Sequence, residues 1–343
     1  MCAVMTEVRY VLVTGAAGGV GRSVCETLIR GGFAVRALIR PEDDRRAVQL
    51  SDNSVVLGDV QDAASVKRAM DGVDAVVHCA AVLPNTPGVS PDQYDSINRG
   101  GTEMVLEAAC SYKLKAAIFF STISVVDHNA RKIDRATMCE YADPGDDAYL
   151  ASKIAAEQFV FATRGAFPGH LAIIRPGFVY GPWAMGVWRT PLRLVTGGQM
   201  ALIGGGEVGL PLAYADDIAA YVIALLRGPR YQAPYDVHVV ANPEATTIAE
   251  VFKFIADYMG APSPRYVPSW PLAIGATVCE RLPESMRIGP LAMLTRARLR
   301  QYSMGYDLSG VLDHPLLSQV PMTSYRVGLS RMLDEYLSHP ERF

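Results

Sequence analysis

A glycine-rich turn near the start of the chain constrains the fold more than any other segment. The sequence VLVTGAAGGVG sets three glycines, at positions 15, 18 and 21, between an apolar strand-like run and an amphipathic helix-like run. Glycine lets a backbone turn sharply, and the start of a helix offers free N–H groups and a positive dipole end to a phosphate. This context predicts a dinucleotide-binding turn rather than a merely structural one. The expected cofactor contacts are Gly15, Ala17, Gly18, Gly19, Val20 and Gly21.

Short apolar runs alternate with amphipathic segments through the first half of the chain. The predicted strands cover residues 10–14, 34–39, 55–57, 75–79, 117–120 and 171–174, and the predicted helices cover 20–30, 64–70, 101–110 and 149–164. Continuous apolar strands separated by helices predict an α/β fold with a doubly wound parallel sheet. In such a sheet the ligand crevice lies at the carboxyl ends of the strands.

The texture of the sequence changes after residue 176, where Gly and Pro become frequent and helical periodicity becomes intermittent. We therefore predict a Rossmann-type dinucleotide-binding domain over residues 1–176. A smaller substrate-binding lobe is expected over residues 177–343, interleaved with late elements of the sheet.

Composition argues against several other classes of protein. Half of the 343 residues are hydrophobic and the net charge is −3 without a long run of one sign, so we expect no binding to nucleic acid. The cysteines and histidines lack metal-ligand spacing, which predicts no metal site, reduced thiols and a cytoplasmic protein. The most apolar late stretch, residues 270–278, falls short of the roughly 18 residues of a membrane span, and we expect core or pocket wall there.

The end of the second predicted strand indicates which nicotinamide cofactor is used. An acid there would bind a ribose 2′-hydroxyl, whereas an arginine favours a 2′-phosphate. The strand ends on Arg40 without a preceding acid, so NADP(H) is favoured and NAD(H) is the alternative. An arginine that is only solvated at a strand end is the non-functional interpretation. Further expected cofactor contacts, after the third and fourth strands, are Asp59, Val60, Ala80 and Ala81.

The segment AYLASKIAAEQ sets Tyr149 and Lys153 four residues apart, on one face of a predicted helix. A neighbouring ammonium makes the phenolate easier to form, so this pair can exchange a proton with a substrate oxygen. We expect Lys153 also to contact the cofactor. A further hydroxyl should lie at a strand end, where Ser121, Thr122 and Ser124 are the candidates.

Taken in order, these motifs resemble the extended short-chain dehydrogenase/reductase family over about residues 8–217. INRGGTEMVLEAA is similar to the family's Asn-x-x-Gly-Thr helix, and IIRPGFVYGPW to its Arg-Pro-x-x-x-Tyr-Gly-Pro segment, where we expect cofactor contacts from Pro176 and Val179. In this family the catalytic hydroxyl residue stands three positions before a valine. Val125 corresponds to that valine, so the resemblance implies Thr122 among the three candidates. The Thr-Asp-Glu of sugar-nucleotide dehydratases is absent, because this chain reads Thr122-Ile123-Ser124.

The C-terminal third is more faintly similar to the 3β-hydroxysteroid dehydrogenase-like and ketone reductase branch, which implies a hydrophobic substrate. Aromatic and methionine side chains after residue 182 would form an adaptable apolar pocket, although each could equally be core. Because Arg189 and Arg193 could bind phosphate groups, a substrate that carries a nucleotide diphosphate stays an alternative. The expected substrate contacts are Ser124, Tyr149, Trp183, Met185 and Trp188.

Three functions follow from these observations. The leading one is an NAD(P)(H)-dependent carbonyl reductase or alcohol dehydrogenase for a hydrophobic small molecule. The alternatives are a sugar-nucleotide epimerase with tightly bound NAD, and a non-enzymatic redox sensor, against which the Tyr149–Lys153 pair argues. The family resemblance further implies a homodimer formed through helices beside the active site.

Overall fold

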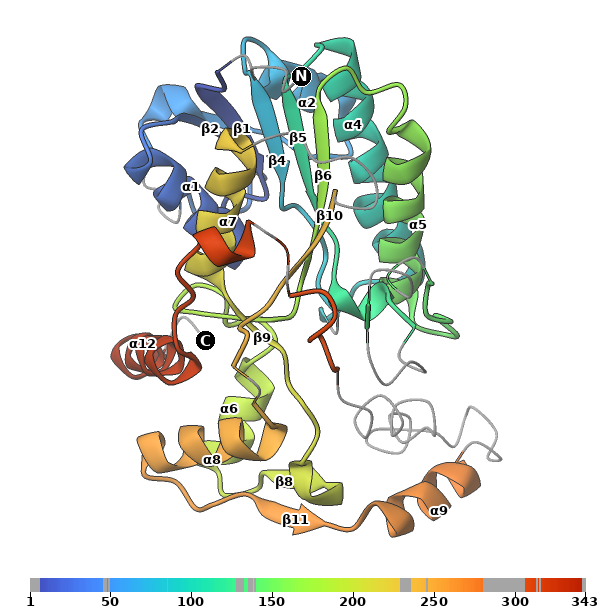
Figure 1. Ribbon diagram of the computed structural model, residues 1–343, viewed down its shortest axis with the longest axis vertical. Coiled ribbons are helices and arrows are strands. Elements are labelled where there is room, and N and C mark those ends of the chain that lie inside the picture. Colours follow the sequence, from blue (N-terminus) through green and yellow to red (C-terminus); the bar gives the residue numbers. More distant parts are fainter. Residues whose placement is uncertain are drawn as a thin grey trace.

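The computed structural model describes residues 7–45, 48, 50–84, 86–127, 133–134, 138, 140–228, 236–244, 246–279, 306–312, 314 and 316–340. A seven-stranded parallel sheet forms the centre of the molecule (Figure 1), and its strands run in the order β10-β6-β5-β4-β1-β2-β3. The strands of this sheet are β1 (Tyr10–Thr14), β2 (Ala34–Ile39), β3 (Val55–Leu57), β4 (Ala75–His78), β5 (Ala116–Phe120), β6 (His170–Pro176) and β10 (Val237–Val240). The predicted doubly wound, Rossmann-type sheet is confirmed.

Helices cover both faces of the sheet (Figure 1). On one face lie α1 (Gly19–Arg30) and α7 (Ala215–Arg227); on the other lie α2 (Ala63–Met70), α4 (Gly101–Ser111) and α5 (Ala148–Thr163). Alternate strand residues point to opposite faces, so Leu12 packs with the second set and Val11 and Val13 with the first. Burying each such aliphatic side chain stabilises the fold by about 1.5–3 kcal/mol. The elements predicted from the sequence all occur, with ends shifted by one or two residues.

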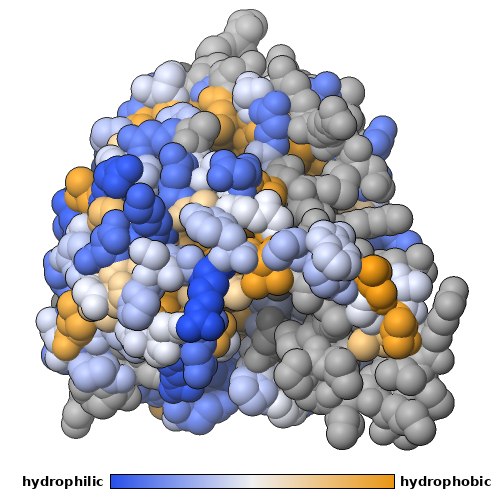
Figure 2. All heavy atoms as spheres, turned by 90° about the horizontal axis from the view of Figure 1, so that it is seen from below, coloured by the Kyte–Doolittle hydropathy of each residue, from blue (hydrophilic) through white to orange (hydrophobic). Residues whose placement is uncertain are grey.

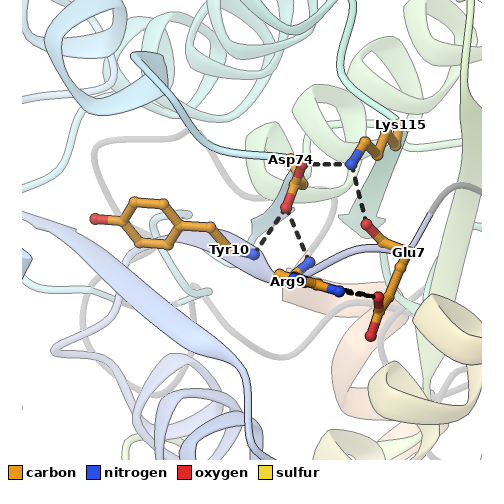
Figure 3. A network of polar contacts seen from close by, with 5 residues as sticks. All are labelled: Glu7, Arg9, Tyr10, Asp74 and Lys115. Atoms are coloured by element: carbon orange, nitrogen blue, oxygen red, sulfur yellow. Dashed lines mark hydrogen bonds and ion pairs between the residues drawn. The ribbon is translucent and has the colours of Figure 1, made fainter.

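The amino-terminal edge of the sheet is held by a polar network centred on Asp74 (Figure 3). The Asp74 carboxylate accepts hydrogen bonds from the backbone N–H groups of Arg9 and Tyr10, at 2.9 and 3.0 Å, and pairs with the Lys115 ammonium at 2.7 Å. These residues stand at the starts of β1, β4 and β5, so the network joins three neighbouring strands at the edge opposite their carboxyl ends.

A smaller lobe lies at the other end of the sheet, below it in Figure 1. Its elements are β7 (Phe178–Tyr180), α6 (Arg189–Thr196), β8 (Ala201–Ile203), β9 (Leu212–Tyr214), α8 (Ile248–Met259), β11 (Arg265–Val267), α9 (Ser269–Cys279) and α12 (Tyr325–Ser338). Residues after 176 also supply α7 and β10 to the larger part, so the two predicted units are interleaved along the chain.

The apolar stretch 270–278 is only partly buried, which differs from the expected core, whereas its role as a pocket wall stays a prediction. It forms most of α9, where Trp270, Ile274 and Val278 are exposed by 67%, 59% and 55%. Their spacing of four residues places them on one helix face, and the helix lies at the margin of the lobe (Figure 1), so most of that face is exposed. Seen from below (Figure 2), separate orange patches interrupt a mostly hydrophilic or neutral surface. No helix among the described residues is long and apolar enough to cross a membrane.

Candidate active site

The glycine turn after β1 is as tight as the sequence predicts. Gly15 has a φ of +64°, and a Cβ there would lie 2.6 Å from the backbone of Ala80, after β4. A Cβ at Gly21 would collide with the carbonyl oxygen of Gly15. The turn therefore has room for backbone only, and it brings Ala80 beside the start of α1.

The start of α1 suits a phosphate group. The N-cap residue is Gly18, which has no side chain. No capping oxygen from this residue therefore competes with a phosphate for the N–H groups of the first turn. We infer that Gly15 to Gly21 would hold the diphosphate of a dinucleotide. No group of three or more acidic, His or Cys side chains placed to hold a metal occurs in the described part of the chain.

The lobe closes directly onto this turn. A Cβ at Gly19 would lie 2.5 Å from the carbonyl oxygen of Trp183, and the Trp183 ring stacks beneath the Arg22 guanidinium, 3.2 Å from the ring centroid. Trp183 was predicted to contact substrate; the structure places it against the cofactor turn. Met185 and Trp188 are buried in the lobe core, where the Trp188 indole donates to the carbonyl of Val179 at 2.8 Å. Substrate contact by these three side chains stays a prediction.

Arg40 lies after the end of β2, at the predicted 2′-phosphate position, and is held by two carboxylates. Its guanidinium contacts Asp43 at 2.8 Å and Glu42 at 3.4 Å, and its backbone N–H donates to Asp43 at 2.9 Å. The side chain is 54% exposed, so a ligand can reach it from solvent. A 2′-phosphate at this place would compete with Asp43 for the guanidinium.

The remaining predicted cofactor residues follow β3 and β4 or lie in β6 and β7. Asp59 closes its own turn by accepting the Gln61 N–H at 2.8 Å, and Val60 is buried against Gly101. Pro176 ends β6 and pairs with β10, while Val179 stands in β7. Ala80 and Ala81 follow β4, beside the glycine turn.

Thr122, Tyr149 and Lys153 meet at the carboxyl end of β5. The Thr122 hydroxyl lies close enough to the Tyr149 phenol to lower its pKa, and the Lys153 ammonium, one turn further along α5, donates to the carbonyl of Phe120 at 2.5 Å. The structure thus brings together the three residues predicted to be catalytic. Ser124, the remaining predicted substrate contact, donates its backbone N–H to Thr122 Oγ1 at 3.2 Å.

Burial controls the protonation of the pair. It raises the pKa of Tyr149 above its usual range, the Asp147 carboxylate raises it further, and the hydrogen bond from Thr122 lowers it. Burial lowers the pKa of Lys153 to about 8, against the opposing charge of Glu157. At neutral pH the phenol is a proton donor and the amine is mostly charged.

A buried polar network positions α5, the helix that carries Tyr149 and Lys153. Asn98, in the π-helical segment η3 (Asp95–Gly100), binds both backbone groups of Val82 and donates to Ser152 Oγ at 3.0 Å; Ser152 in turn donates to the Tyr149 carbonyl at 2.7 Å. The sequence indicates Asn98 only through the resemblance to the family's Asn-x-x-Gly-Thr helix, and no sequence motif indicates Ser152. Neither has a local pattern that reveals the contact.

The same helix carries a buried ion pair. Glu157 is bonded by Arg175 of β6 and by the Tyr141 hydroxyl, and both charged side chains are 1% exposed. Removing one partner of such a pair leaves an uncompensated buried charge and costs about 3–5 kcal/mol. The pair fixes α5 against the sheet behind Lys153.

The fold and this site define an NAD(P)-dependent oxidoreductase of the short-chain dehydrogenase/reductase type. The chain belongs to the NAD dependent epimerase/dehydratase family, whose model matches residues 11–241. The predicted family is therefore confirmed, and a nicotinamide dinucleotide is its cofactor.

Individual relatives agree with this assignment. The chain is 27% identical over 328 residues to a 2-alkyl-3-oxoalkanoate reductase of Stenotrophomonas maltophilia, covering 94% of this chain and 98% of the relative. It is 28% identical over 274 residues to a 3 beta-hydroxysteroid dehydrogenase/Delta 5-->4-isomerase of Mycobacterium tuberculosis, covering 78% and 74%. The crystal structure of gox2253 is similar in fold, with a TM-score of 0.79, 22% identity, and coverage of 96% and 98%.

Proposed function

We propose that the protein is an NAD(P)(H)-dependent carbonyl reductase or alcohol dehydrogenase for a hydrophobic ketone or secondary alcohol. The observation that supports this most is the close approach of the Thr122 hydroxyl to the Tyr149 phenol, with Lys153 one helical turn away. Two hydroxyls that converge at the end of β5 can hold one substrate oxygen between them.

Each residue of this cluster has its own task. In the reductive direction Thr122 donates a hydrogen bond to the carbonyl oxygen, and Tyr149 gives it a proton. The charged Lys153 favours the phenolate that remains. When bound, the nicotinamide supplies or accepts the hydride. Glu157 and Ser152 hold α5 in place, so the phenol keeps its position against Thr122.

Apolar side chains near the site favour a hydrophobic substrate. The ring of Tyr94 packs edge-on to that of Tyr149, with centroids 6.3 Å apart, and its hydroxyl donates to the carbonyl of Leu83. Leu83 and Phe178 are exposed by 48% and 40%, although both are strongly hydrophobic. The names of the two curated relatives also describe an oxo or hydroxyl group on an alkyl or steroid framework.

The test is reduction of aliphatic and alicyclic ketones with NADPH or NADH by the wild type and by Tyr149→Phe. We expect the variant to lose about 10²–10⁴-fold in kcat, because it cannot deliver the proton. The matched control is Tyr258→Phe, which removes a hydroxyl bonded to Asp334 at 2.6 Å between α8 and α12 and should leave the rate unchanged. A Tyr149→Phe rate equal to that of the wild type would contradict the assignment. Isomerisation of a sugar nucleotide without added nicotinamide would instead favour the epimerase.

We further propose that NADP(H) is preferred, through Arg40. Arg40→Ala should weaken NADPH binding tenfold or more, an order of magnitude expected for loss of a charge-assisted phosphate contact, and leave NADH unchanged. Asp43→Asn keeps the shape of the turn but removes the competing charge, so it should tighten NADPH binding alone. Nicotinamide fluorescence titrations measure both affinities. Wild-type binding that is equal for the two cofactors, or favours NADH, would contradict the preference.

A further inference from the structure

A tyrosine from the C-terminal part of the chain reaches the hydroxyl cluster at the end of β5. The phenol of Tyr306 lies next to the Ser124 side chain, and the backbone N–H of Ser124 donates to Thr122 Oγ1 at 3.2 Å. Four hydroxyl side chains therefore lie in succession, from Tyr149 through Thr122 and Ser124 to Tyr306. The first two suffice for a carbonyl oxygen, which leaves the second two without a task in the proposed chemistry.

The position of Tyr306 is fixed from several directions. Its ring meets that of Phe178 edge-on, with centroids 6.2 Å apart and an interplanar angle of 75°. The next residue, Asp307, accepts the Ile133 N–H on its carbonyl at 2.9 Å, and Gly310 bridges to Asp134. These contacts hold the segment against the chain that follows Ser124. A side chain held so firmly beside the catalytic hydroxyls suits a role in selecting substrates.

We propose that Tyr306 and Ser124 form a second polar contact of the substrate site, which binds an uncharged hydrogen-bonding group carried close to the substrate's reacting carbonyl. This inference rests on the proposed function. Two neutral hydroxyls can donate to a carbonyl or ester oxygen and accept from a hydroxyl. Tyr306 is accordingly a positioning residue rather than an acid.

The charges around the cluster disfavour an anion in this place. The Asp147 carboxylate acts on Tyr149, and the Lys153 ammonium is engaged by the Phe120 carbonyl. Burial raises the pKa of Tyr306 to about 12, with the Ser124 hydrogen bond opposing, so this phenol keeps its proton at neutral pH. A neutral acceptor such as an ester oxygen satisfies the site without adding a second negative charge.

The experiment compares a β-keto ester with the simple ketone of equal chain length, in which methylenes replace the ester. Loss of one neutral hydrogen bond costs about 0.5–1.5 kcal/mol, or roughly a two- to twelvefold rise in KM. Tyr306→Phe should show that rise for the keto ester only, with kcat and nicotinamide affinity unchanged. Ser124→Ala should act in the same direction, and the double variant should add little, because both hydroxyls serve one group. Tyr258→Phe is again the control.

The possible outcomes distinguish failure of this inference from failure of the proposed reductase function. Equal KM ratios for the two substrates in wild type and Tyr306→Phe would overturn the second contact while leaving the reductase intact. A fall in kcat for both substrates would assign Tyr306 to the chemistry and also overturn its positioning role. Wild-type protein that reduces neither ketone would overturn the proposed function and this inference with it.

Discussion

Lys153 should set the alkaline limit of the reaction. Its burial lowers the pKa to about 8, and only the charged amine favours the phenolate of Tyr149. The charged form is present below that pKa and is lost above it, so kcat/KM for ketone reduction should be level near pH 7 and fall through about pH 8. Lys153→Arg should be slower, but without this falling limb, because guanidinium stays charged. A wild-type profile still level at about pH 10 would refute the role of this amine.

The residues predicted to be catalytic are recognisable in the sequence where their spacing is local. Tyr149 and Lys153 share a helix face, and Thr122 follows a strand whose apolar run is plain in the sequence. The contact between Ser124 and Tyr306 was not, because it joins distant parts of the chain through tertiary packing. The carboxylates that hold Arg40 were visible as Glu42 and Asp43, but the pairing depends on a turn conformation that the sequence does not fix.

The start of α1 is expected to couple cofactor binding to the lobe. A Cβ at Gly19 would meet the Trp183 carbonyl at 2.5 Å, so Gly19→Ala must displace either the lobe segment or the turn. We expect roughly tenfold weaker nicotinamide binding, which corresponds to about 1.4 kcal/mol, with the fold retained. The control is Gly165→Ala, where an added Cβ meets nothing within 4 Å. Fluorescence titration and thermal unfolding measure the two effects, and unchanged affinity in Gly19→Ala would argue against the coupling.

The long strands and helices of the sheet were predictable because their apolar periodicity extends over enough residues. Strands β7, β8, β9 and β11 have only three residues each and, unlike the equally short β3, lie in the Gly- and Pro-rich part of the chain where strands and helices do not alternate regularly. Strand β10 joins the sheet from beyond the predicted boundary at residue 176. The exposed face of α9 was not foreseen either, because an apolar run does not reveal whether anything covers it.

In the whole molecule, the amino-terminal ends of the sheet strands carry a stabilising network, and their carboxyl ends carry the candidate active site. Burial raises the pKa of Asp74, but hydrogen bonds from Lys115 and from the backbone of Arg9 and Tyr10 outweigh it and hold that pKa below its usual range. Asp74→Ala should lower the free energy of unfolding by about 1–3 kcal/mol at pH 7 and leave kcat unchanged, because the site is at the opposite edge.

The stabilisation by Asp74 should depend on pH in one direction. Because the pKa of Asp74 is lower in the folded protein, this carboxylate stabilises the fold at pH values above its pKa in the unfolded chain, about 3.9. The contribution is lost as the pH falls through the pKa of the folded protein. Urea unfolding should therefore show a constant gap between wild type and Asp74→Ala from about pH 7 to 5, narrowing below about pH 4. A gap that widens in acid would contradict this origin of the stability.

Transfer of a deuterium label tests the proposed chemistry most directly. The protein would be given a hydrophobic ketone and a nicotinamide cofactor deuterated at its hydride position, and the product analysed by mass spectrometry. A carbonyl reductase forms an alcohol with one deuterium on the former carbonyl carbon, in step with cofactor oxidation, and Tyr149→Phe slows this by about 10²–10⁴-fold. No label in any ketone tested, from protein shown to bind the cofactor, would contradict the assignment as a carbonyl reductase.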